Sequence, residues 1–153
     1  MPFTIQALNE NNTVNIAQLS MVLNPITPIF TEADWSGGSS AVGVINVANT
    51  SPVDFAFFVS ADWYAGGGDT IQNARLLAER LNIEVIGDPG GANVLIYDGS
   101  LAGLIQQPPG GYVLGAGQDV NVQFTLSLPD ANATDLIQGM SIEFDLVFVA
   151  VEA

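Results

Sequence analysis

The sequence predicts an all-β protein: an antiparallel jelly-roll-type β-sandwich with one short α-helix, at about residues 69–81, and long Gly/Pro-rich loops. Apolar runs rich in β-branched and aromatic residues recur along the chain and are separated by clusters of Gly, Pro, Asn and Asp. A chain of 153 residues is long enough to bury a core within one domain. Many short strands with a single helix pack most naturally as two antiparallel sheets, so we expect a sandwich.

Nine segments carry the strand pattern. In the last two the alternation is most regular, because every second residue is apolar. Residues 24–30 contain two prolines and are expected to form an edge or an irregular crossover, and residues 99–107 are expected to form a turn with a helical tendency. The expected strands are residues 3–8, 13–23, 41–49, 53–63, 83–86, 93–97, 112–114, 120–128 and 141–151.

One segment changes to helical periodicity. Asp69 is expected to be its N-cap, where a carboxylate also suits the positive end of the helix dipole. Arg75 and Arg80, the only cationic side chains of the chain, fall in its middle and last turns. The apolar residues recur with helical spacing, so the buried stripe is expected to consist of Ile71, Ala74, Ala78 and Leu81.

The composition excludes several classes of function. Lys and Arg together number 2 against 16 Asp and Glu, and the formal net charge is −14. Such a polyanion lacks the basic surface that binds nucleic acid or an anionic membrane. His and Cys are absent, which removes Ser-His-Asp triads, thiol nucleophiles, haem ligands and ordinary zinc sites. With no apolar run of about 18 residues to cross a bilayer, we expect a non-enzymatic structural or binding protein without a resident cofactor.

Three segments together point to a family. They are INVANTSPVDFAFFVSADW (residues 45–63), VLIYDGSLAGL (94–104) and LGAGQDVNVQFTLSLPDANATDLIQGMSIEFDLVFVA (114–150). In this order and spacing the chain resembles the TasA/camelysin family of secreted biofilm-fibre proteins, including the related archaeal bundling pili. The resemblance implies an extracellular jelly roll whose subunits join by donor-strand exchange. Some members of that family have been classed as metalloproteases, but without His and an HExxH motif this chain has no chemistry for that activity.

The N-terminal residues have the alternating pattern expected of the donor strand. Phe3, Ile5 and Ala7 alternate with polar residues, as expected of a strand with one buried face, and residues 9–12 form a polar linker. We therefore divide the chain into a donor strand with its linker, residues 1–12, and one jelly-roll domain, residues 13–153. The first residues show neither the basic nor the apolar region of a signal peptide, so we expect a mature secreted form whose leader has been removed.

The leading interpretation is a subunit of an extracellular filament, a biofilm matrix fibre or bundling pilus, whose partners are copies of itself. Two alternatives stay open: a monomeric calcium- or carbohydrate-binding β-sandwich, and a viral jelly-roll capsid or decoration protein. Calcium would need the acidic residues of the Gly-rich loops, although a local backbone-bonding role is favoured for them. These residues are Asp69, Asp88, Asp98, Asp119, Asp130 and Asp135.

Three further groups of residues were candidates for a site. A sugar-stacking platform would use Trp35, Trp63, Tyr64 and Tyr97, although packing is favoured for these aromatics. A glycosidase-like carboxylate pair would come from Glu143 and Asp145, or from Asp54 and Asp62, and is disfavoured because alternating acids usually form the wet face of a strand. Candidate glycosylation sites in predicted turns or loops are Asn11, Asn49 and Asn132.

Overall fold

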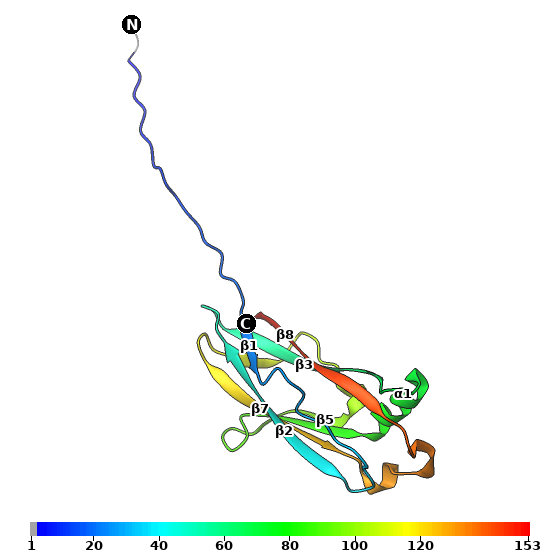
Figure 1. The fold of residues 1–153 in the computed structure, drawn as a ribbon. Helices are drawn as coiled ribbons and strands as arrows, with labels where there is room; N and C mark the ends of the chain where they lie inside the picture. Colours follow the sequence, from blue (N-terminus) through cyan, green and yellow to red (C-terminus); the bar gives the residue numbers. More distant parts are fainter. Residues whose placement is uncertain (1–2) are drawn as a thin grey trace.

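Apolar alternation in the long strands produces two antiparallel sheets that pack face to face. The computed structural model describes residues 3–153, and the larger sheet has the order β1-β2-β7-β4-β5. The smaller sheet has the order β6-β3-β8 (Figure 1). The predicted all-β sandwich with one short helix is therefore confirmed, whereas the jelly-roll connectivity stays a prediction. The strands are β1 (Met21–Asn24), β2 (Ser40–Asn49), β3 (Phe55–Ala65), β4 (Asn82–Gly87), β5 (Val94–Ser100), β6 (Tyr112–Leu114), β7 (Asp119–Ser127) and β8 (Ile142–Glu152).

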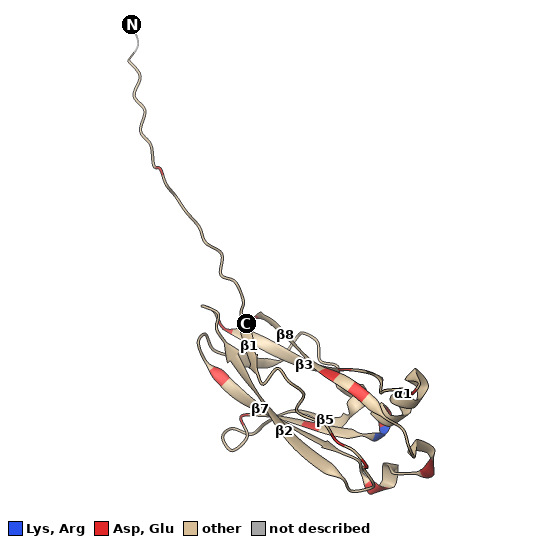
Figure 2. Ribbon diagram, viewed as in Figure 1, with Lys and Arg blue, Asp and Glu red and all other residues tan. Residues whose placement is uncertain are grey.

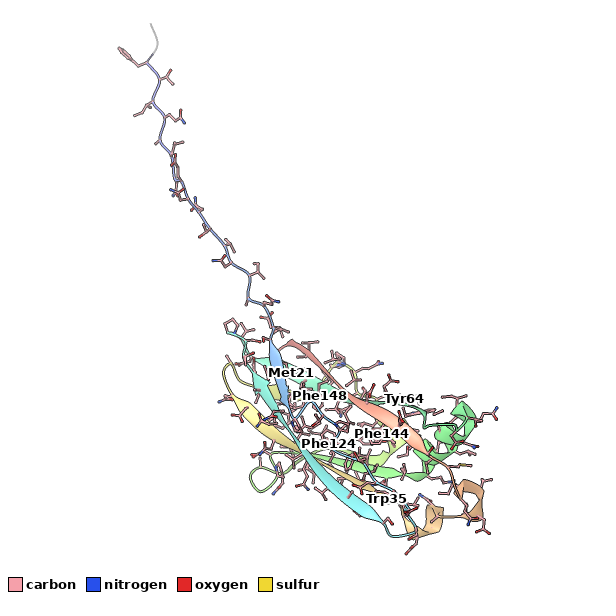
Figure 3. All side chains as sticks on the ribbon, viewed as in Figure 1. Met21, Trp35, Tyr64, Phe124, Phe144 and Phe148 are labelled. Carbon is pink, nitrogen blue, oxygen red and sulfur yellow. The ribbon has the colours of Figure 1, made fainter. Side chains whose placement is uncertain are left out.

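The core lies between the inward faces of β3 and β7. Phe57 of β3 and Phe124 of β7 are almost completely buried, and both pack against Phe148 of β8, with ring centroids 6.0 and 6.2 Å apart. Burying a side chain of this size contributes about 1.5–3 kcal/mol. The labelled aromatic residues in Figure 3 show Phe124, Phe144 and Phe148 converging between the sheets.

The strand prediction is wrong for residues 13–20. Of the expected strand 13–23, only residues 21–23 lie in a strand, β1 (Met21–Asn24), whereas residues 3–8, predicted to be a donor strand for a neighbouring copy, belong to neither sheet of the single chain. The alternation of these residues is real, but a strand also needs a backbone partner, and residues 3–18 have none in the described chain. After Asn24, the last residue of β1, residues 25–30 form an irregular crossover, as expected. A short 3-10 helix at Leu101–Gly103 confirms the helical tendency of that turn.

The α-helix is α1 (Ile71–Arg80), and its cap differs from the prediction. Thr70 is the N-cap: its hydroxyl accepts a hydrogen bond from the Asn73 amide at 3.2 Å. Asp69 lies one residue earlier and is not the cap. Ile71 is 60% exposed and is wrongly placed in the buried stripe, because it opens the helix directly after the exposed loop at residues 67–68. The buried residues of the helix and its C-cap are Ala74, Leu77, Ala78 and Leu81.

Two further 3-10 helices, Asp130–Asn132 and Asp135–Ile137, connect β7 to β8 and lie beside α1. Arg80 joins the two regions: its guanidinium donates to the Asn132 carbonyl at 3.1 Å and to the Thr134 hydroxyl at 3.0 Å. In the part of the chain that the structure describes, no helix has the length and apolar character needed to cross a membrane.

We expect Leu81→Asp to lower the free energy of unfolding by more than about 3 kcal/mol, because it places a charge where a buried leucine packs. Gln72→Asp, on the exposed side of α1, is the matched control and should change stability by less than about 0.5 kcal/mol. Urea denaturation followed by circular dichroism measures both variants. Equal losses would show that α1 does not pack as described.

Candidate assembly interface

The N-terminal segment carries apolar side chains that contact nothing. Residues 3–18 are all exposed, with Phe3 at 101% and Ile5 at 95% of their full accessible surface. Figures 1 and 3 show this segment extending away from the sandwich in a nearly straight line. Ala7, the third residue of the predicted donor strand, is exposed in the same way. Exposed apolar side chains of this kind make the segment a candidate for association with another surface.

Strand β8 offers a free edge on the same molecule. Its eleven residues pair with β3 along their whole length, from Ile142 opposite Ala65 to Glu152 opposite Phe55. Within residues 3–153, no other strand pairs with β8. An edge strand with unpaired N–H and C=O groups is a template for a further strand. At eleven residues β8 is the longest edge strand of the sandwich, since β1, β5 and β6 have four, seven and three residues.

The core is incompletely covered along this edge. On β3 the inward side chains of Phe55, Phe57 and Val59 are at most 1% exposed. On β8 the inward residues are only half-buried, although they lie on the same face of the same sheet. These half-buried residues are Ile142, Phe144, Leu146, Phe148 and Ala150. A strand added beside β8 would bury them further.

The segment between β1 and β2 crosses this open side of the sandwich. Phe30 packs on Phe144 of β8 with ring centroids 6.1 Å apart. Ile29 lies on Gly43 of β2, where a Cβ atom would come within 2.8 Å of its side chain. A side chain at residue 43 would therefore displace Ile29, so glycine lets the crossing segment lie close to the sheet.

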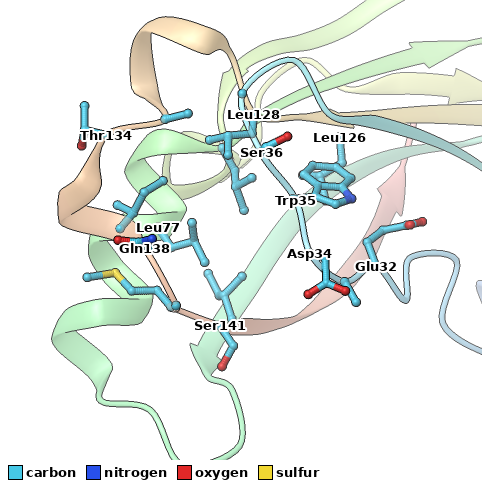
Figure 4. A pocket seen from close by; sticks show the side chains of 18 of the residues that line it. Glu32, Asp34, Trp35, Ser36, Leu77, Leu126, Leu128, Thr134, Gln138 and Ser141 are labelled. Carbon is cyan, nitrogen blue, oxygen red and sulfur yellow. The ribbon is translucent and has the colours of Figure 1, made fainter.

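A cavity of about 790 Å³ opens next to the start of β8 (Figure 4). The apolar part of its lining includes Trp35, Leu77, Leu126 and Phe144, and the acidic part includes Glu32 and Asp34. Its walls come from the crossing segment, α1, β7, β8 and the 3-10 helix at Asp135–Ile137. Apolar walls with an acidic border suit an uncharged apolar occupant better than an anionic one.

Asp69 fixes the start of β8 to the start of α1. One carboxylate oxygen accepts hydrogen bonds from the Thr70 amide at 2.9 Å and the Asn73 side-chain amide at 2.7 Å. The other accepts from the Ser141 amide at 2.8 Å. These three donors, Ser141 first, hold the pKa of Asp69 below its ordinary value. Asp69, which was predicted to cap the helix, therefore links the start of α1 to the residue directly before β8.

The candidate carboxylate pair Glu143 and Asp145 lies on an open face of the sheet. Asp62 and Asp145 are opposite each other on β3 and β8, and Tyr64 is opposite Glu143. Asp145 raises the pKa of the Tyr64 hydroxyl most, followed by desolvation and by Glu143. All four side chains are exposed on the outer face of the smaller sheet, so the pairs lack the enclosed geometry of a glycosidase. Asp54 is elsewhere and accepts a hydrogen bond from the Ala116 amide at 2.8 Å.

The four aromatic residues considered for a sugar-stacking platform do not come together, in line with the favoured packing role. Trp63 and Tyr64 are consecutive residues of β3 and point to opposite faces of the sheet. Tyr97 packs against the core from β5 and donates its hydroxyl to the Ser100 carbonyl at 2.6 Å. Trp35 lies in the cavity wall. Alternation along a strand separates residues that are adjacent in sequence, so the four aromatics reach different surfaces.

The acidic loops do not converge on a cation site. Among residues 3–153, no three acidic side chains lie close enough together to hold a metal ion. Several of them instead bond local groups: Asp88 accepts from the Ala92 amide at 3.0 Å, and Asp119 accepts from the side chain of Asn46 at 2.8 Å. Asp98 accepts from the side chain of Asn82 at 3.1 Å. Asp130 and Asp135 begin the two 3-10 helices that follow β7.

The three candidate glycosylation sites differ in accessibility. Asn49 is 1% exposed, and its side-chain amide donates to the carbonyls of Val53 and Leu114, both at 2.9 Å. The expectation that it lies in an accessible turn is wrong, because this amide satisfies buried carbonyls. Asn132 is half-buried and donates to the Arg80 carbonyl at 3.0 Å. Asn11 is exposed in the N-terminal segment.

Comparison with known proteins assigns no family. No protein-family model matches the chain, and a search of curated proteins finds no match.

Because the pKa of Asp69 is lowered in the folded state, its hydrogen bonds stabilise the protein above the unfolded pKa of about 3.9 and are lost as the pH falls through the lowered value. We expect Asp69→Asn to destabilise the protein at pH 7, with a smaller difference from wild type at pH 3. Glu32→Gln, an exposed carboxylate without a side-chain hydrogen bond among residues 3–153, is the control. Thermal unfolding at a series of pH values measures the effect, and a difference that grows towards acid pH would contradict it.

Proposed function

We propose that the protein is the structural subunit of an extracellular filament that polymerises head-to-tail through its N-terminal strand. One observation carries the proposal: a single chain presents both an exposed, alternating apolar segment and an unpaired eleven-residue edge strand. Each of these features is a liability in a monomer. Each one is satisfied when residues 3–8 of one copy pair with β8 of the next.

The chemistry of such a junction is β-augmentation. Main-chain hydrogen bonds to β8 supply affinity, and the side chains of Phe3, Ile5 and Ala7 supply register by entering the half-covered core. None of residues 3–8 is charged, and the only charged residue of the segment 3–20 is Glu10. The segment therefore avoids repulsion by the acidic border of the cavity.

The geometry favours an open chain of subunits over self-complementation. Residues 3–20 extend over about 60 Å at 3.3 Å per residue, and they lead away from the sandwich (Figure 1). A segment on one surface that binds a different surface of the next copy makes a heterologous contact, and such contacts propagate. The absence of Lys excludes isopeptide bonds between side chains, so cohesion is noncovalent.

The extracellular location rests on the resemblance to secreted biofilm-fibre proteins. The same proposal makes the protein a non-enzymatic component whose partners are its own copies, without nucleic acid or membrane. The two alternatives predict different assembly states. A monomeric calcium- or carbohydrate-binding module stays at 16.0 kDa, and a viral capsid or decoration protein forms closed shells. Negative-stain electron microscopy of the purified protein separates them, because only a filament subunit forms open fibres.

Deleting residues 1–9 should give a soluble, folded protein that no longer polymerises, because the donor segment is gone and the sandwich is intact. Ile5→Asp should do the same by placing a charge in an apolar site. Gln6→Asp, on the opposite face of the strand, is the matched control and should still assemble. Sedimentation and electron microscopy measure polymer. A synthetic peptide of residues 3–18 should raise the melting temperature of the truncated protein, and normal filaments from the truncated protein would overturn the donor role.

Assembly should depend on ionic strength and pH because each subunit carries a formal charge of −14. Acidic side chains are spread over strands and loops of the whole sandwich (Figure 2), so neighbouring subunits repel within a screening length of about 8–10 Å. Polymerisation followed by light scattering should accelerate when salt is raised from 20 to 500 mM, which shortens the screening length from roughly 20 Å to roughly 4 Å, and when the pH is lowered towards 5. Rates that fall with salt would show that attraction between opposite charges drives the contact.

A further inference from the structure

The N-terminal segment contains a second apolar stretch that a single donor strand does not use. Val14 and Ile16 are 83% and 86% exposed and alternate with polar residues, as Phe3 and Ile5 do. The two stretches are separated by four polar residues, Asn9 to Asn12. Two alternating runs with a short polar connection are the sequence pattern of a β-hairpin.

The connection is already suited to a turn. The side-chain amide of Asn12 donates to the backbone carbonyl and the side-chain oxygen of Asn9, at 3.0 and 3.1 Å. Asn11 has a φ of 64°, in the left-handed region that many turns require and that Asn tolerates better than most residues. These contacts join Asn9 and Asn12, which would be the first and last residues of a four-residue turn.

A turn at residues 9–12 brings the two stretches into a register that matches their side chains. Leu8 then lies opposite Thr13, so that Ala7 is opposite Val14 and Ile5 is opposite Ile16. The Ala7–Val14 and Ile5–Ile16 pairs lie on one face of the hairpin, together with Phe3 and Gln18. The other face carries Thr4, Gln6, Leu8, Thr13, Asn15 and Ala17. Aligning the two stretches in this way concentrates their apolar residues on one side.

The sandwich lacks two strands on the side where the hairpin would dock. Five strands face three. Tyr112 of β6 lies on Gly87 of β4, and Phe148 of β8 lies on Phe124 of β7, so positions beyond β8 face β2 and β1. This is the side where the inward residues of β8 are half-buried and where Ile26 of the crossing segment is 91% exposed. Two added strands would bring the smaller sheet to five strands, beside the crossing segment whose Ile29 covers Gly43 of β2.

We propose that the donor is a β-hairpin formed by residues 3–18, which docks with its Ile5–Ile16 face inward on the free edge of β8 of a second copy. The proposal rests on the proposed function, since it names the form in which the same segment engages its partner. An isolated two-stranded hairpin is marginally stable in water, so the segment is extended in the single chain and folds as it docks. A single extended strand of residues 3–18 would instead set the polar residues 9–12 against the middle of β8.

Distance measurement in assembled filaments tests the hairpin directly. The chain has no Cys, so the double variant Thr4→Cys, Ala17→Cys takes spin labels only at these two outward-facing positions. In the hairpin their Cβ atoms are about 5 Å apart, whereas in one extended strand they are about 43 Å apart. In filaments diluted with unlabelled protein, the short distance should appear as dipolar broadening of the continuous-wave electron resonance spectrum, whereas the long distance, measured by double electron–electron resonance, would overturn the hairpin.

A covalent closure gives a second, independent readout. Ile5→Cys, Ile16→Cys should form a disulfide that closes the hairpin in register, and the oxidised protein should polymerise to the same extent as its reduced form. Ile5→Cys, Asn15→Cys places the thiols on opposite faces and is the control, whose oxidation should block assembly. If assembly fails when Ile5 and Ile16 are replaced even in the reduced state, Ala7→Cys, Val14→Cys provides the same in-register closure. Loss of polymer on oxidation of the in-register pair would overturn the hairpin.

The outcomes separate the two proposals. Wild-type filaments with a long Thr4–Ala17 distance leave the filament proposal standing and remove the hairpin. A wild-type protein that never polymerises removes the filament proposal. A short distance in a chain that stays monomeric shows that the hairpin docks on its own β8 and overturns docking on a second copy.

Discussion

The pairing of β3 with β8 is the interaction on which the rest of the structure depends. It aligns eleven residues of each strand and thereby places Phe57 and Phe148 over the aromatic centre of the core. The smaller sheet consists otherwise only of the three-residue β6, so without this pairing it would not cover the larger one. The same pairing uses one edge of β8 and leaves the other free. Stability of the sandwich and its capacity to accept a further strand are therefore two results of one contact.

Asymmetry between the sheets explains why the N-terminal half of the chain is irregular. The larger sheet ends in β1, which has four residues, and the chain then crosses towards β8 through Ile29 and Phe30. This crossing segment covers part of the core that a complete smaller sheet would cover. Because it is held by side-chain contacts and not by a ladder, it leaves the backbone of β8 unpaired.

Sequence reasoning succeeded where a pattern depends only on which face of a strand is buried. The alternation of Val122 and Phe124 predicts an inward row, and both residues are completely buried. It failed where burial depends on a partner: residues 13–20 alternate as well as many true strands do, yet they lie outside both sheets. The free edge of β8 and the adjoining cavity had no local signal, since an unpaired edge is a property of topology. Asn49 was misplaced for a related reason, because the carbonyls that bury it come from Val53 and the distant Leu114.

The position of the two arginines affects how readily the protein is cleaved by proteases. Trypsin-like enzymes cut after Lys or Arg, and the long exposed segment at residues 3–18 contains neither. Arg75 and Arg80 both lie within α1, where the backbone is held in helical hydrogen bonds and cannot adopt the extended form that a protease binds. The most exposed segment of the chain therefore contains no tryptic cleavage site. The two tryptic sites of the sequence, Arg75 and Arg80, both lie in an ordered helix.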